Sequence, residues 1–130
     1  MENIGPNPFA PGMTSSMFIP DQLIAGQLQL VTDSVTMAQF GLLKRGSVLG
    51  MNKSGEYVLS VKTATDGSEK PAAILVDAVD TTVSSQTAGV YLMGEFNAHR
   101  IIFDKSWTLA ELKTALRPFS IFLKDSTPGF

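Results

Sequence analysis

Four of the seven prolines of this 130-residue chain lie within its first 20 residues. Each proline fixes φ and removes a backbone N–H donor, so a helix or a central strand is excluded there. Apolar side chains lie among the prolines, which a solvated linker would not need. Two interpretations remain open: a flexible tail, or an extended arm that lays these residues on a neighbouring chain. The residues that such an arm offers to its partner are Pro6, Pro8, Phe9, Pro11, Met13, Met17, Phe18, Ile19 and Pro20.

Beyond the arm, short segments alternate apolar and polar residues, as half-buried strands do. The tetrapeptide Asn-Lys-Ser-Gly at 52–55 predicts a hairpin turn between two of them. We expect two parts, an arm over residues 1–22 and a single β-rich domain over residues 23–130. The strands are predicted at residues 27–37, 42–43, 48–49, 57–62, 72–79, 89–96 and 100–103.

One helix is predicted near the C-terminus. Thr108 is followed three residues later by Glu111, a capping-box pattern that makes Thr108 the expected N-cap, and Pro118 ends the helix. The apolar residues on one face of this helix are Leu109, Leu112 and Leu116. The residues that alternate in a closing strand are Phe119, Ile121 and Leu123. The expected fold class is mainly β: a small β-barrel or sandwich-like domain with one short α-helix near the C-terminus and an extended N-terminal arm.

Composition excludes several classes of function. The chain has no cysteine, so disulfides and thiolate chemistry are absent. A formal net charge of -2 provides no basic surface, so direct nucleic-acid binding is not expected. No apolar run reaches the roughly 18 residues of a membrane-spanning helix, and the N-terminus has no signal-peptide pattern. We expect synthesis in a cytoplasm and no membrane partner.

The sequence does not indicate a catalytic, cofactor-binding or metal site. His99 is the only histidine, and it precedes an apolar run, as a loop or strand-edge residue does. Asp77 and Asp80 flank a strand end, but no further oxygen ligands are evident for a metal ion. Residues 66–69 lack the pattern of an EF-hand loop and indicate a turn. We therefore expect neither an enzyme nor a bound cofactor or metal.

The order of elements in the middle of the chain is more informative. An Asp-Gly turn at 66–67 precedes a small-residue strand at 72–76, a Thr/Ser-rich connection follows, and Gly-Glu-Phe at 94–96 ends a second strand. Gly-Ser-Val-Leu-Gly at 46–50 precedes this series, and the short helix and a final apolar strand follow it. Over roughly residues 42–124, this order resembles the head decoration protein D family of lambda-like bacteriophages.

That resemblance implies a β-rich fold with a short helix, a homotrimer, and binding at the three-fold positions of an expanded capsid. It also implies that the N-terminal segment becomes ordered on the shell and pairs with strands of the major capsid protein. The expected function is decoration of the outer surface of the virion capsid, which stabilises the head against the pressure of packaged DNA.

Two other functions remain open. One is another virion component, such as a tail or head-completion subunit built on a small barrel. The other is a barrel that binds a small ligand or a glycan, which would need exposed aromatic side chains around a concave site. The aromatic residues available for that purpose are Tyr57, Tyr91 and Trp107.

Overall fold

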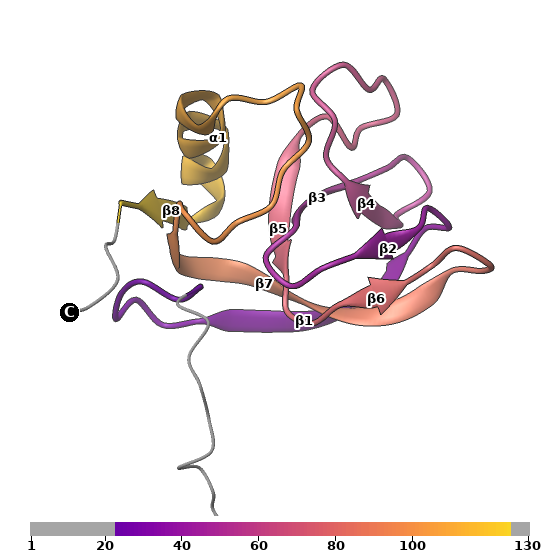
Figure 1. The fold of residues 1–130 in the computed structure, drawn as a ribbon, viewed down its shortest axis with the longest axis horizontal. Coiled ribbons are helices and arrows are strands. Elements are labelled where there is room, and N and C mark those ends of the chain that lie inside the picture. The colour runs from indigo at the N-terminus through magenta and orange to yellow at the C-terminus, as the bar shows by residue number, and fades with distance from the viewer. Residues whose placement is uncertain (1–22, 126–130) are drawn as a thin grey trace, which may run out of the picture.

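The structure is a computed structural model that describes residues 23–125; residues 1–22 and 126–130 lie outside this description. The described part consists of short strands and a helix close to its C-terminal end (Figure 1). In chain order the elements are β1 (Val31–Met37), β2 (Leu42–Leu43), β3 (Val48–Met51), β4 (Tyr57–Leu59), β5 (Pro71–Leu75), β6 (Val79–Asp80), β7 (Gln86–Asn97), α1 (Leu109–Leu116), the 3-10 helix η2 (Arg117–Phe119) and β8 (Ile121–Lys124).

Five strands form a closed barrel in the order β1-β4-β3-β5-β7. The barrel closes because β1, at one end of this order, also pairs with β7 at the other end. β1 runs antiparallel to β7 along its whole length, and at Met37 it also pairs in parallel with Tyr57 of β4. β8 extends the sheet beyond β7, and β2 pairs with β6 in a separate two-stranded sheet. The predicted mainly-β barrel with one short helix is confirmed.

The barrel strands serve two hydrophobic cores, because successive side chains of a strand point to opposite faces. On β7, for example, Val90 belongs to the core inside the barrel and Tyr91 to the core between the barrel and α1. The buried residues of the inner core are Met37, Leu43, Leu49, Ala73, Leu75 and Val90. Those of the outer core are Leu23, Val48, Ile74, Tyr91, Phe96, Ala98, Ile101, Leu112, Leu116, Ile121 and Leu123.

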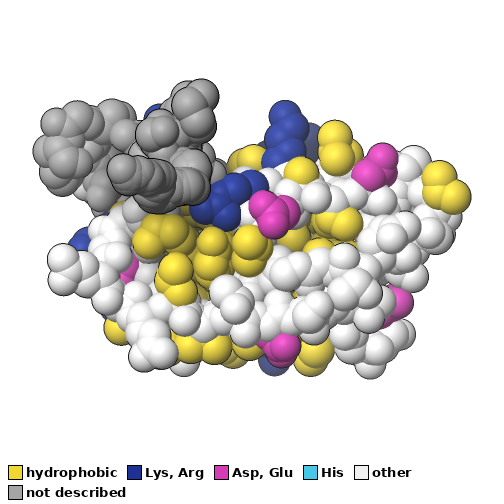
Figure 2. All heavy atoms as spheres, turned by 90° about the horizontal axis from the view of Figure 1, so that it is seen from below, with side chains coloured by type: hydrophobic (Ala, Val, Ile, Leu, Met, Phe, Trp, Pro, Cys, Tyr) yellow, Lys and Arg dark blue, Asp and Glu magenta, His cyan; other side chains and the backbone are white. Residues whose placement is uncertain are grey.

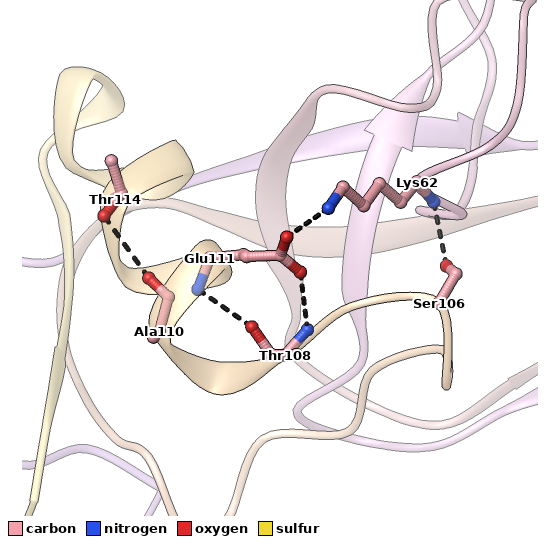
Figure 3. A network of polar contacts seen from close by, with 6 residues as sticks. All are labelled: Lys62, Ser106, Thr108, Ala110, Glu111 and Thr114. Carbon is pink, nitrogen blue, oxygen red and sulfur yellow. Dashed lines mark hydrogen bonds and ion pairs between the residues drawn. The ribbon is translucent and has the colours of Figure 1, made fainter.

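The helix α1 begins as the sequence predicts. The Thr108 hydroxyl accepts a hydrogen bond from the Glu111 backbone N–H at 3.3 Å, and the Glu111 carboxylate accepts one from the Thr108 N–H at 3.0 Å (Figure 3). Lys62 forms an ion pair with the same carboxylate, and its N–H donates to the Ser106 hydroxyl at 2.9 Å. The Lys62 ammonium is the main cause of a lowered pKa of Glu111. The capping box therefore also ties the helix to the segment that follows β4.

Two predicted turns are confirmed. At residues 52–55 the Gly55 N–H donates to the Asn52 carbonyl at 3.0 Å, and Gly55 has a φ of +82°, which glycine adopts without steric cost. At residues 66–69 the Ser68 N–H donates to the Asp66 carboxylate at 3.0 Å. The Ser68 hydroxyl also donates to that carboxylate, which is the first cause of a lowered pKa of Asp66.

Other strand predictions were wrong in extent. Residues 27–30 precede β1 and form no strand, because the Leu28 N–H donates to the Glu95 side chain instead of to the backbone of a neighbouring strand. β4 ends at Leu59 rather than at residue 62. The Ser60 side chain is buried, and its hydroxyl donates to the Ser68 carbonyl at 2.7 Å, so the predicted alternation of buried and exposed residues stops there. The predicted strand at 72–79 divides into β5 and β6.

Two predictions near the C-terminal half were also wrong. Residues 100–103 make only an isolated bridge, between Ile102 and Ser47, because the chain turns where the Arg100 N–H donates to the Asn97 carbonyl. Phe119 belongs to η2 and not to the closing strand, since Ser120 adopts a left-handed conformation with a φ of 62° before β8 starts.

We expect the substitution Thr108→Ala to lower the free energy of unfolding by about 1 kcal/mol, the typical cost of an N-cap hydroxyl. Urea denaturation of both proteins measures the difference. Thr114→Ala is the matched control: it makes the same chemical change within α1, where the Thr114 hydroxyl only donates to the Ala110 carbonyl at 3.3 Å. Because alanine favours helix interiors, the control should be neutral or slightly stabilising. Equal losses in both variants would contradict a capping role.

Candidate functional site

The nine residues predicted to contact a partner lie outside the described part of the chain, so their contacts stay a prediction. The structure does show where the segment that carries them joins the domain. These nine residues are Pro6, Pro8, Phe9, Pro11, Met13, Met17, Phe18, Ile19 and Pro20.

The join is a short antiparallel pairing between residues 23–25 and the end of β7. The Asn97 N–H donates to the Leu23 carbonyl at 2.7 Å, and the Ala25 N–H donates to the Glu95 carbonyl at 2.9 Å. Ile24 forms a bridge with Phe96 between them. The Leu23 side chain is only 2% exposed and belongs to the outer core. The predicted arm is therefore attached to a segment that is fixed both by hydrogen bonds and by burial.

A carboxylate reinforces this join. Glu95 Oε1 accepts a hydrogen bond from the Leu28 N–H at 3.0 Å, and Glu95 Oε2 lies 3.5 Å from Lys124 Nζ. The Leu28 N–H is the first cause of a lowered pKa of Glu95, and Lys124 lowers that pKa further. A Cβ on Gly26 would lie 1.9 Å from Glu95 Oε1, so glycine is needed there for the close approach. One side chain thus connects the segment after the join, β7 and β8.

Both ends of the described chain meet at the same end of β7. The Asn97 N–H donates to the Leu23 carbonyl, and the next N–H, that of Ala98, donates to the Lys124 carbonyl at 2.8 Å. Successive N–H groups of a strand point to opposite edges, so Leu23 and Lys124 lie on opposite edges of β7. Residues 1–22 and 126–130 are therefore attached at one end of the domain.

A second surface feature is an apolar groove of about 350 Å³ beside β2. Its most exposed apolar side chains are Phe40 at 52% and Leu42 at 60%. Lys44 is the one charged residue in its lining. The lining residues are Phe40, Leu42, Leu43, Lys44, Ser47, Leu59 and Ile102.

The aromatic residues considered for a ligand- or glycan-binding barrel do not converge on this groove. Tyr91 is buried in the outer core, where its ring centroid lies 5.3 Å from that of Phe96. Tyr57 packs against the inner core and Trp107 against the outer one. None of the three lines the groove. These aromatic side chains contribute to packing within the described domain.

Charged side chains are few on the face that Figure 2 shows. Seen from the side on which β1 lies in Figure 1, hydrophobic side chains gather along the middle of the face and a few charged ones lie around them (Figure 2). The exposed side chains of His99 and Asp125 contact each other. Within residues 23–125, no group of three or more His, Asp or Glu side chains is placed to hold a metal ion. Asp77 and Asp80 are not brought together with further ligands in this range.

Sequence reasoning missed both the Glu95 contact and the groove. The local signal for the first was Gly26, a glycine outside any predicted turn, but its partner lies 69 positions later in the chain. The signal for the groove was weaker. It was the apolar residue Ile102, which follows the buried Ile101 and is itself 41% exposed. Neither arrangement could be derived from local spacing, since the first depends on the path of β7 in the barrel and the second on where the separate strand β2 lies.

Comparison with protein families identifies the chain. The model of the family described as bacteriophage lambda head decoration protein D matches residues 13–120, most of the chain. The chain belongs to this head decoration protein D family. The match extends further toward the N-terminus than the resemblance over residues 42–124 and includes the second half of the predicted arm. No curated protein matches the sequence.

Membership of a head decoration family assigns the chain a structural role on the phage capsid, in the virion. It also makes a phage capsid the binding partner at the level of the family. In the described residues, no helix is long and apolar enough to cross a membrane.

We expect Glu95→Gln to lower the free energy of unfolding at neutral pH, because an amide oxygen accepts the Leu28 hydrogen bond less strongly than a carboxylate does. The folded-state pKa of Glu95 is lowered, so its charged form stabilises the fold above the ordinary pKa. That contribution is lost as the pH falls through the lowered value. The difference between wild type and variant should therefore shrink between about pH 6 and about pH 3, on either side of the usual Glu pKa of about 4.3.

Chemical denaturation at several pH values measures this difference. Glu56→Gln, in the turn between β3 and β4, is the control for the change from carboxylate to amide. Gly26→Ala is an independent variant, because the added methyl group should displace the Glu95 carboxylate. Its stability difference from the wild type should shrink over the same pH range. A stability difference for Glu95→Gln that stays constant over this pH range would contradict the role assigned to the carboxylate.

Proposed function

We propose that this head decoration protein binds the outer surface of the expanded phage head as a homotrimer and stabilises the shell against the pressure of packaged DNA. Its partner is the major capsid protein, and the arm of residues 1–22 adds to strands of that protein. The observation that carries the proposal is the join: residues 23–25 are hydrogen-bonded to β7 at the point where the arm begins.

The join suits a mechanical role. A pull on the arm acts on the backbone hydrogen bonds between residues 23–25 and β7, and on the buried side chain of Leu23. From β7 the load passes to β1, β5 and β8, which all pair with that strand. Because the barrel is closed, no strand of the barrel can be peeled away without breaking pairings on both of its edges. A link of this kind resists the outward movement of neighbouring capsid subunits.

Strand addition supplies the binding energy. An extended segment that adds to a sheet edge gains main-chain hydrogen bonds, and its alternate side chains fill pockets. Ordering about 20 residues costs about 20–40 kcal/mol. Burial of Phe9, Phe18 and Ile19 offsets part of this cost, at about 1.5–3 kcal/mol for each large side chain. A trimer presents three arms, and binding of the first raises the effective concentration of the others.

We expect a chain that starts at Asp21 to stay folded but to lose most of its affinity for expanded empty capsids. The loss should be about a hundredfold or more, equivalent to about 2.7 kcal/mol, because the main-chain pairing and the apolar anchors are removed together. Co-sedimentation with capsids of the source phage measures it, and thermal unfolding checks that the shortened domain is intact. Undiminished capsid binding by a folded, shortened chain would exclude the arm as the anchor.

We also expect capsid binding to depend weakly on salt. Glu2 is the one charged side chain among residues 1–20, and hydrogen bonds and apolar contacts are little affected by screening. The dissociation constant should change by less than about threefold between about 0.05 M and about 0.5 M NaCl, concentrations that shorten the Debye length severalfold. A steep loss of affinity with salt would show that charged residues of the domain make the contact instead.

A further inference from the structure

The outer edge of β1 has no strand beside it over most of its length. Within residues 23–125, one edge of β1 pairs with β7 from Val31 to Met37, and the other edge meets only Tyr57 of β4, at Met37. Residues 31–34 and 36 are exposed. In Figure 1, β1 runs along one margin of the described domain. The edge of β1 before Met37 is therefore uncovered in the described part of the chain.

The hydrogen bonds show which backbone groups point to this edge. The Gly89 carbonyl accepts from the chain just after β5, so Gly89 faces β5 and its two neighbours on β7 face β1. Ser34 lies opposite Gly89 and so exchanges no hydrogen bonds with β7. The Ala38 N–H, which has the same parity as Ser34, donates to a carbonyl of β4 at 2.9 Å. The backbone groups of Thr32 and Ser34 therefore point to the outer edge.

One of these groups is already held by a side chain. Asp33 Oδ1 accepts a hydrogen bond from the Ser34 N–H at 2.8 Å, and Asp33 is the one charged residue of β1. Lysine and proline, which often protect edge strands from added strands, do not occur in β1. The groups that stay available to an added strand are the N–H and C=O of Thr32 and the C=O of Ser34.

This edge lies on the side of β7 from which the arm starts. Val90 faces β1, and the register of β7 then shifts by one residue between Tyr91 and Met93. After the shift, the residues that face the same edge are Met93, Glu95 and Asn97. The backbone of the last two binds residues 23–25. A strand added to β1 is therefore on the same side of the domain as the join of the arm.

We propose that an extended segment of the major capsid protein adds to the outer edge of β1 at Thr32 and Ser34. This inference rests on the proposed function, which it deepens by naming the part of the folded domain that contacts the capsid protein beside the arm. Membership of the family makes a phage capsid the partner, and strand addition binds an extended segment through its main chain. Two β1 edges paired with each other would form a two-fold dimer and not the proposed trimer.

Asp33 restricts the chemistry of the added segment. Residues directly opposite each other on adjacent strands interact, and like charges at such positions are destabilising. The segment therefore carries no Asp or Glu opposite Asp33, and a Lys or Arg fits that position. A basic side chain there also draws the Asp33 carboxylate away from the Ser34 N–H, which can then donate to the added strand.

Amide hydrogen exchange in the free protein and in the protein bound to expanded empty capsids tests this pairing. The Thr32 N–H should exchange rapidly in the free protein and about tenfold or more slowly on capsids. The Val35 N–H, which faces β7, is the internal control and should be protected in both states. Rapid exchange of the Thr32 N–H on capsids would contradict the proposal. A protected Thr32 N–H in the free protein would show that a second copy or another segment of this chain covers the edge, and would overturn it too.

A proline substitution tests the same contact by affinity. Thr32→Pro removes the outward N–H and keeps the hydrogen bonds between β1 and β7, because proline is tolerated on an edge strand where its missing N–H would face outward. We expect it to weaken capsid binding by about tenfold or more. Thr32→Ala is the matched control, since it removes the same hydroxyl and keeps the N–H, and it should bind as the wild type does.

Thermal unfolding checks that both variants are folded, and co-sedimentation with capsids measures their affinities. Equal losses of affinity would assign the contact to the Thr32 side chain and overturn strand addition. Undiminished binding by a folded Thr32→Pro variant would overturn it as well. If Thr32→Pro does not fold, the exchange of the Thr32 N–H in the wild type decides the question without any variant.

The chain that starts at Asp21 separates this inference from the proposed function. If removal of the arm abolishes capsid binding while the Thr32 N–H of the bound wild type exchanges rapidly, the proposed function holds and the pairing at β1 fails. If the shortened chain still binds and its Thr32 N–H is protected on capsids, the pairing at β1 holds and the arm is not the anchor. A wild-type protein that does not bind capsids would contradict both.

Discussion

The rest of the structure depends on the pairing of β7, whose two faces and two edges are all in use. One face contributes Val90 to the core inside the barrel, and the other contributes Tyr91 to the core under α1. Phe96 belongs to the same core as Tyr91, because the register of β7 shifts by one residue between Tyr91 and Met93. Along its edges β7 pairs with β1, β5, β8 and residues 23–25. Because a one-residue slip would exchange the two faces, the two cores together fix the register of every strand that β7 contacts.

This arrangement explains why both ends of the described part of the chain lie at one end of β7. The carbonyl groups of Leu23 and Lys124 accept from consecutive N–H groups at the end of β7, so both terminal segments are attached at one end of the barrel. Glu95 connects them through Leu28 and Lys124. In the proposed function the arm holds the protein on the capsid, and load on the arm is passed to the strand to which most of the sheet is paired.

Sequence reasoning succeeded where the determinants are local. The Thr108 capping box, the turn at 52–55 and the Asp-Gly turn at 66–67 each depend on residues a few positions apart, and all three are present. It failed at residues 100–103, where an apolar run forms a single bridge because the chain turns at Asn97. The contact between Gly26 and Glu95 was out of reach, since it depends on the path of the chain around the barrel. The predicted arm lies outside the described residues and remains a prediction.

A cryo-electron microscopy reconstruction of expanded heads decorated with the full-length protein tests the central claim most directly. The proposed function predicts trimers at the three-fold positions of the outer surface, with continuous density from Leu23 into an arm that adds a strand to the major capsid protein. Density for the barrel on the shell without an arm in contact with the capsid protein would contradict anchoring by the arm. The absence of the protein from the outer surface would contradict the decoration role itself.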